Sequence, residues 1–181
     1  MHQSPDSVIS FWFEEIAPKQ WWEKSADFDQ LIFRRFGALH KAAAACELFA
    51  WRETALGRLA EILVLDQFSR NIYRDQASAF ACDPLALALA QTAVAVQADS
   101  ELEVKERSFL FLPYMHSESS MMHLVAMALF DAPGMESSLE FERKHKDIIE
   151  RFGRFPHRNA LLGRVSTPNE IEFLAMPDSS F

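Results

Sequence analysis

The chain is poor in glycine, tyrosine and cysteine, and these scarcities narrow the classes of structure it can form. Only 5 of its 181 residues are glycine and 2 are tyrosine. Few glycines mean few tight turns, which argues against an all-β sandwich and suits helices joined by short links. The two cysteines, Cys46 and Cys82, lack Cys-x-x-Cys or Cys/His spacing. This pattern indicates unpaired thiols in a reducing, cytoplasmic compartment.

Long apolar runs are also scarce. We find no stretch approaching the roughly 18 apolar residues that span a bilayer. The first six residues lack the basic segment and apolar stretch of a secretory signal. We therefore expect a soluble cytoplasmic protein without a membrane partner, folded as a single domain over residues 1–181.

Charge is unevenly distributed along the chain. The net charge of −8 makes nucleic acid an unlikely partner. Residues 143–164 nevertheless hold seven of the 18 basic side chains, opposed there by Asp147 and Glu150 alone. A locally basic segment on an acidic protein favours a small anion over a polyanion.

Apolar spacing and capping residues predict an all-α fold of about eight helices, arranged as a bundle or as a stack of antiparallel helix pairs. We place the helices near residues 5–17, 26–39, 54–68, 83–97, 103–113, 117–131, 137–152 and 168–174. Ser25 and Asp83 are expected to cap the second and fourth helices, Gly153 to end the seventh, and Thr167 and Glu170 to form a capping box at the last. The third is apolar nearly all round and should be central. Pro113 should end or kink the fifth. We expect the core to include Phe36, Leu59, Ile62, Leu63, Leu124, Phe141, Ile148, Ile149 and Phe152.

The third predicted helix ends in a polar segment that runs from Asp66 to Arg74. Asp66 and Arg70 are four residues apart on one helical face and are placed to form an ion pair. One interpretation is a structural salt bridge that closes the helix. The other is that Arg70 or Arg74 faces a ligand, with Asn71 between them.

A second polar segment surrounds Gly153 and Pro156, and it carries Arg151, Arg154, His157, Arg158 and Asn159. Arginine is suited to two-pronged recognition of carboxylate or phosphate, and histidine can add a proton donor. Alternatively, these cations cap helix ends and pair with acidic groups such as Asp66. Because both polar segments follow apolar helices, we expect them to meet in space, with Arg158 and His157 facing solvent.

Histidines elsewhere suggest acid–base chemistry more than metal binding. His116, Glu118, His145 and His157 are candidates for general acid or base. His123 lies nearby, but no tight His-x-x-x-His spacing accompanies it, so we predict no metal site and no cofactor. Asp66, His116, Glu118 and His145 are expected to act as structural polar partners of the arginines.

Five strings together resemble one bacterial family: VISFWFEEIAPKQWW, LDQFSRNIYR, residues 83–90, FLPYMHSE and ERFGRFPHRNALLGRVSTPNEIEF. It is the family called domain of unknown function nine-two-four. The resemblance covers nearly the whole chain and implies a tetratricopeptide-repeat-like fold of antiparallel helix pairs, with no established activity. Residues 119–125 depart from the family pattern, which usually has a polar run there. A site lined by that run in relatives would be altered in this chain.

These observations favour a binding protein for an unidentified peptide or small anion. Its alternatives are a small-molecule enzyme that uses the arginine and histidine cluster, and a purely structural role for the motifs. Catalytic residues and oligomeric state stay open. The expected ligand-binding residues are Arg70, Asn71, Arg74, Arg154, His157, Arg158 and Asn159.

Overall fold

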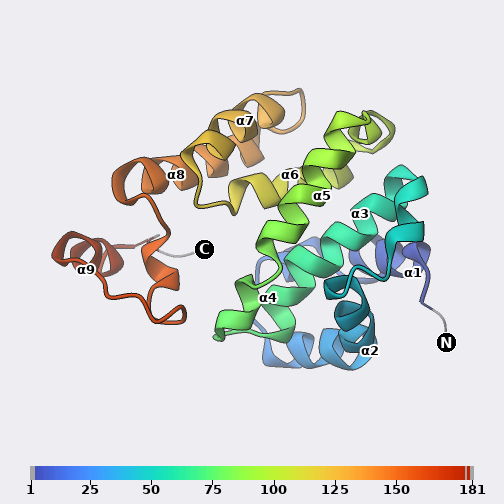
Figure 1. Ribbon diagram of the computed structural model, residues 1–181, viewed down its shortest axis with the longest axis horizontal. Coiled ribbons are helices and arrows are strands. Elements are labelled where there is room, and N and C mark those ends of the chain that lie inside the picture. Colours follow the sequence, from blue (N-terminus) through green and yellow to red (C-terminus); the bar gives the residue numbers. More distant parts are fainter. Residues whose placement is uncertain (1–2, 178, 180–181) are drawn as a thin grey trace.

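A computed structural model describes residues 3–177 and residue 179, and throughout this part of the chain the regular elements are helices. The predicted all-α class is therefore confirmed. Helix α1 and the C-terminal helix α9 lie at opposite ends of the long axis of the molecule (Figure 1).

The N-terminal part forms around proline and serine caps. Helix α1 (Pro5–Ser10) has Ser4 as its cap and continues as a π turn over Phe11–Glu15. A 3-10 turn (Pro18–Trp21) then leads to α2 (Ala26–Ala44). The Ser25 side chain accepts a hydrogen bond from the Phe28 N–H at 3.3 Å, so this serine caps α2 as expected.

One long central helix carries the first polar segment. It consists of α3 (Ala55–Leu63), a wide π turn (Val64–Phe68) and α4 (Ser69–Ile72), and it runs four residues beyond the predicted end. Helices α1, α2, α5 and α6 pack against different parts of it. Leu59, Ile62 and Leu63 are fully buried, which confirms the central position. The helix therefore presents its polar end at residues 66–72 to several neighbouring elements.

The remaining helices pack on one another in order: α5 (Asp83–Ala95), α6 (Val104–Met115), α7 (Ser120–Phe130) and α8 (Glu136–Phe152). Pro113 lies within the last turn of α6, which ends two residues later than predicted. The implied tetratricopeptide-repeat-like order of the pairs stays a prediction. Short 3-10 turns occupy Phe49–Glu53, Ala77–Phe80 and Ala98–Glu101.

The C-terminal segment turns back from α8. Gly153 adopts φ +69°, the left-handed conformation expected of a helix C-cap. A 3-10 turn (Pro156–Arg158) and α9 (Pro168–Leu174) follow. Thr167 and Glu170 form the predicted capping box, since each side chain binds the backbone N–H of the other residue.

Two predicted core residues are at the surface: Leu124 is 57% exposed and Phe141 is 50% exposed. Helix α7 instead buries His123, Ala126 and Phe130, at a helical spacing of three and four residues. Leu124 is adjacent to His123 and so points about 100° away from that stripe. On α8 the polar residues Glu142 and His145 take inward positions. The two placements were wrong because His123 on α7 and Glu142 on α8 take buried positions that were expected to hold apolar side chains.

The segment Ala77–Ala95 has the length and mean hydropathy of a membrane span. Within the fold, however, Asp83 lies inside this segment and pairs with two arginines. One face, formed by Ala86, Leu89, Ala90 and Ala93, is buried, and α5 packs on α3 and α6. In this structure α5 is therefore packed on the body of the fold through one face, with Asp83 in its first turn held by ion pairs.

Candidate functional site

Five charged or ionisable side chains join in a continuous chain, which we call the charged network: His116, Asp66, Arg70, Asp83 and Arg158. They come from the C-terminal end of α6, the π turn, α4, the first turn of α5 and the 3-10 turn after α8. The two polar segments thus meet, as predicted, and Asp83 joins them. Such a convergence of buried charge is costly unless each group is paired.

Asp66 is the most enclosed member, with 1% of its side chain exposed. It receives hydrogen bonds from the Gln67 amide at 2.6 Å and from His116 Nδ1 at 2.8 Å, and Arg70 Nη1 lies 3.2 Å from Oδ1. Burial opposes its charge, but Arg70 and His116 outweigh burial and hold the pKa of this carboxyl well below its usual range. Asp66 is therefore a carboxylate at neutral pH.

His116 is oriented by this carboxylate. Because Asp66 is ionised, the ring nitrogen Nδ1 must carry the hydrogen that it shares with Oδ1. Burial, followed by the positive charge of Arg70, lowers the pKa of His116. The ring is then neutral at pH 7, and its second nitrogen Nε2 is an acceptor. Since 16% of the His116 side chain is exposed, the ring lies at the edge of the network.

Asp83 is shared by the two arginines. Arg70 binds it through Nη1 and Nη2 at 3.1 and 3.2 Å, and Arg158 Nη1 binds it at 3.2 Å. These distances exceed the 2.7–2.9 Å typical of charge-assisted bonds. One carboxylate thus holds two guanidinium groups at slightly long range.

Arg158 combines deep burial with few hydrogen bonds. Its guanidinium carbon lies 4.6 Å from the ring centres of both Phe80 and Phe155. Of its five N–H donors, one binds Asp83, and the buried Nε finds no partner among the described residues. Burial, followed by the charge of Arg70, lowers the pKa of Arg158 to about 10. The side chain is 8% exposed, so the expectation that Arg158 faces solvent was wrong.

Two further histidines lie beside the network. The pKa of His157 is lowered to about 4 by burial and then by the charges of Arg158 and Arg70. Burial lowers the pKa of His145 to about 3, although the Nδ1 hydrogen bond to the Phe141 carbonyl opposes this shift. The His145 ring is 6.4 Å from that of His116. Positive charge is therefore disfavoured at His145, His157 and Arg158, with burial as the largest cause at each of them.

Asn71 and Arg74, both predicted to bind a ligand, contact Asp29 of α2. Arg74 binds it through Nε and Nη2, the latter at 2.7 Å, and the Asn71 amide binds it at 2.8 Å. These bonds hold α4 against α2. Ligand contact by the two residues stays a prediction, and in this structure both side chains serve packing.

Arg154 and Asn159, also predicted to bind a ligand, tie the C-terminal segment to itself. Arg154 binds Glu170 of α9 at 2.7 and 2.9 Å. The Asn159 amide donates to Ser166 Oγ at 3.0 Å and accepts from Arg164 Nε at 3.0 Å. Their ligand contact likewise stays a prediction.

Counter-charge for Arg154, Arg158 and Arg164 of the basic segment comes from outside it. Arg158 pairs with Asp83 and not with Asp66, which corrects the expected pairing. Arg164 pairs with Glu118 at 2.6 Å, and Glu118 also accepts the Phe155 N–H at 2.8 Å. Glu118 is thus a structural partner, as predicted. The partner choice was wrong because Asp83, at the start of a helix, was interpreted as a cap.

A second buried polar pair was missed by the sequence interpretation. His123 Nδ1 lies 2.7 Å from Glu142 Oε1, both side chains are fully buried, and His123 Nε2 is 2.8 Å from the Ser117 carbonyl. Lys146, four positions after Glu142 on α8, binds Glu150 instead. The only signal was position: Glu142 shares a helical stripe with Leu139, His145 and Ile149.

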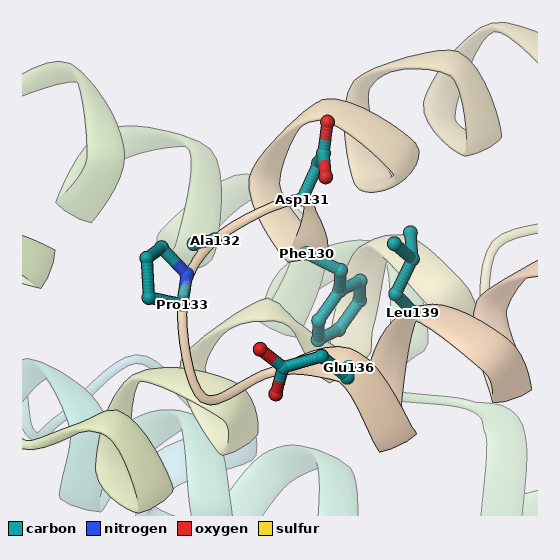
Figure 2. A pocket seen from close by; sticks show the side chains of 6 residues that line it. All are labelled: Phe130, Asp131, Ala132, Pro133, Glu136 and Leu139. Carbon is teal, nitrogen blue, oxygen red and sulfur yellow. The ribbon is translucent and has the colours of Figure 1, made fainter.

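Two open hollows lie away from the charged network. One, at the link between α7 and α8, is lined by Phe130, Asp131, Ala132, Pro133, Glu136 and Leu139 (Figure 2). Its two charged side chains are both acidic, so it does not suit an anion. The other lies between the end of α8 and the start of α9, where Arg154 and Glu170 already neutralise each other. In the part of the chain that the structure describes, no three or more His, Cys, Asp or Glu residues gather as metal ligands.

Comparison with known proteins agrees with the resemblance stated above. The model of the family described as bacterial protein of unknown function (DUF924) matches residues 8–178. A solved structure of a protein of unknown function from Agrobacterium tumefaciens is 39% identical, with a TM-score of 0.90 over 94% of this chain and 96% of that one. No curated protein matches the chain. The chain therefore belongs to the DUF924 family of bacterial proteins.

Proposed function

We propose that this protein binds a small anionic ligand at the exposed edge of the charged network, through Arg158 and Arg70. The observation that carries the proposal is the state of Arg158. Its guanidinium is buried between two phenylalanine rings, yet only one of its five N–H donors is used within the described residues. A buried donor without a partner costs free energy, and a carboxylate or phosphate group would supply the missing acceptors.

The electrostatics of the surrounding groups support the same ligand charge. Burial and mutual repulsion lower the pKa values of Arg158, His116 and His157. A bound anion offsets the repulsion between Arg158 and Arg70, because opposite charge favours the charged form of a guanidinium group. Because Arg70 and Arg158 share one carboxylate, that of Asp83, some of their N–H donors remain available for such a ligand.

The small exposed area favours a small molecule over a peptide. The exposed fractions of the side chains are 21% for Arg70, 16% for His116, 14% for Asp83 and 8% for Arg158. Side chains this little exposed can contact one anionic group but offer no extended surface for a chain.

The enzyme alternative has one observation in its favour, the hydrogen bond between Asp66 and His116 at 2.8 Å. A carboxylate that fixes one imidazole nitrogen leaves the other as a base, as general acid–base catalysis requires. In that case the bound anion is a substrate, and its slow conversion would be detected by NMR spectroscopy during the binding experiments.

The test is the thermal stability of the protein with phosphate, malonate or sulfate at constant ionic strength. A ligand at a concentration 100 times its Kd raises the free energy of unfolding by about 2.7 kcal/mol. For a chain of this size, that increase raises Tm by roughly 5–10 °C. We expect such a rise for at least one anion in the parent protein, and its loss in Arg158→Met. Arg143→Met, which changes an exposed arginine of α8, is the matched control and should keep the shift.

The purely structural alternative predicts the opposite result. If Arg158 serves only to form a structural ion pair with Asp83, no anion raises Tm above the value measured in chloride. Arg158→Met then costs roughly 3–5 kcal/mol, the usual consequence of breaking a buried pair. Under our proposal the variant without anion stays near parent stability, because Asp83 keeps Arg70 as a partner.

A further inference from the structure

The charged network offers a ligand two different kinds of partner. Arg70 and Arg158 supply donors to an anionic group. His116 supplies an acceptor, because its Nδ1 hydrogen is committed to the Asp66 carboxylate at 2.8 Å. Arginine cannot accept a hydrogen bond and neutral Nε2 cannot donate one, so the two roles cannot exchange.

The tautomer of His116 is held by several contacts. Asp66 is kept in place by the Gln67 amide at 2.6 Å and by Arg70, which binds its backbone carbonyl at 2.6 Å and its side chain at 3.2 Å. The charged groups acting on His116 are Arg70, Asp66 and Asp83. Of these, the two carboxylates favour a charged ring, whereas Arg70 and burial oppose it, and the net effect is a neutral ring.

His116 and Arg70 also lie against the same atom, Oδ1 of Asp66. His116 Nδ1 is 2.8 Å from this oxygen and Arg70 Nη1 is 3.2 Å from it. Arg158 joins Arg70 at Asp83, which pairs with both guanidinium groups. A small ligand held by the arginines is therefore within reach of the His116 edge.

From this arrangement we infer that the ligand is an anion that carries its own O–H or N–H donor, such as a partly protonated phosphate or a 2-hydroxy acid, and that His116 Nε2 accepts from this donor. The inference rests on the proposed function. A fully deprotonated anion of the same shape, such as sulfate, would bring an oxygen lone pair against the nitrogen lone pair. Sites built to bond a hydroxyl discriminate strongly against analogues that lack it.

Two matched pairs of probes test this selectivity by titration calorimetry at pH 7. Phosphate and sulfate are both tetrahedral, but at pH 7 inorganic phosphate carries at least one proton, whereas sulfate carries none. Malate and succinate differ by one hydroxyl. At equal ionic strength we expect phosphate to bind at least about tenfold more tightly than sulfate, and malate at least about tenfold more tightly than succinate, a difference of roughly 1.4 kcal/mol.

Variants and a direct probe assign the preference to His116. In His116→Phe the preference for phosphate over sulfate should fall to about twofold or less, while Arg143→Met leaves it unchanged. If His116→Phe does not fold, nitrogen-15 NMR spectroscopy of the parent gives the answer. Nε2 should lack a hydrogen without ligand, and its resonance should shift on addition of phosphate.

The outcomes separate this inference from the proposed function. Equal affinity for phosphate and sulfate in the parent, or a hydrogen on Nε2 at pH 7, overturns the donor requirement and leaves anion binding standing. If none of the four anions binds, the proposed function itself fails. If His116→Phe still binds phosphate tenfold more tightly than sulfate, the inference is also overturned. Another group must then accept the hydrogen bond from the ligand.

Discussion

At the scale of single residues, burial controls the chemistry of the histidines. His40, His116, His145 and His157 all have pKa values below the ordinary value for histidine, and burial is the largest cause in each case. A neutral imidazole can donate through one nitrogen and accept through the other. The fold therefore uses these rings as hydrogen-bonding groups of fixed direction.

His145 allows a quantitative test of this burial. Its folded-state pKa is about 3, below the unfolded value of about 6.5. Its neutral form thus contributes stability that is present above pH 6.5 and lost as the pH falls towards 3. Between pH 6.5 and 4.5 the free energy of unfolding should fall by about 2 kcal/mol less in His145→Gln than in the parent, as measured by urea denaturation.

The comparison needs a neighbour that does not titrate in this range. Lys144→Gln changes an exposed side chain of the same helix, and its pH curve should run parallel to that of the parent. Parallel curves for His145→Gln and the parent would show that His145 is protonated in the folded state, contrary to our interpretation.

Prediction from the sequence found the arginines and one pair close in the chain, but it missed the partners that are distant in the chain. Asp66 and Arg70 were paired correctly, because positions four apart on a helix are neighbours. Asp83 was missed as the partner of Arg158, since the two are 75 positions apart and only the tertiary fold joins them. Asp29, which holds Arg74, was missed for the same reason.

At the scale of elements, glycine shows where the packing is tight. A Cβ added at Gly57 in α3 would lie 1.9 Å from the backbone carbonyl oxygen of Trp51, in the preceding 3-10 turn. Because the obstacle is backbone, the turn or the helix must shift. We expect Gly57→Ala to destabilise the protein by about 3 kcal/mol or more, above the usual range for overpacking.

Gly37 of α2 provides the matched control, since the nearest atom to its added Cβ is Cδ2 of Phe33 at 3.4 Å. Alanine is favoured over glycine within a helix by roughly 0.5–1 kcal/mol. Gly37→Ala should therefore be neutral or stabilising in chemical denaturation. Similar losses in both variants would contradict the tight contact between α3 and the Trp51 turn.

Helix positions were predictable from local signals, whereas helix orientation was less so. The caps at Ser25 and Thr167 and the stop at Gly153 lie where the sequence places them. Leu124 of α7 and Phe141 of α8 were placed in the core wrongly, because a buried pair, His123 and Glu142, occupies the interior between these helices. Apolar periodicity alone gives no sign that two polar residues on different helices will pair.

At the scale of the whole molecule, the C-terminal segment is attached differently from the rest. Most buried apolar residues form one cluster spread over α1 to α8, whereas Ile148, Ile149 and Phe155 form a second, smaller one. Ionic contacts join this part to the main body: Arg158 to Asp83 of α5, and Arg164 to Glu118 after α6. The charged network therefore lies where the segment meets the body, and its geometry depends on that attachment.

Glu118 offers the means to weaken this attachment selectively. It binds Arg164 through both oxygens, at 2.6 and 2.9 Å, and it accepts the Phe155 N–H. Burial opposes its charge, but Arg164 and the Phe155 N–H outweigh burial and lower its pKa. Its contribution to stability is thus present above the unfolded pKa, about 4.3, and is lost as the pH falls below that value.

Replacing the carboxylate with an amide should loosen the segment and spare the body. We expect Glu118→Gln to cost about 1–2 kcal/mol, the order of magnitude of a charge-assisted bond at a partly exposed site. Hydrogen exchange should quicken in residues 153–164 and stay unchanged in α3. Glu140→Gln, at an exposed carboxylate 4.0 Å from Lys144, should alter neither region. Equal acceleration in α3 would mean that the segment and the body unfold as one unit, and anion binding would then report on global stability instead of a local site.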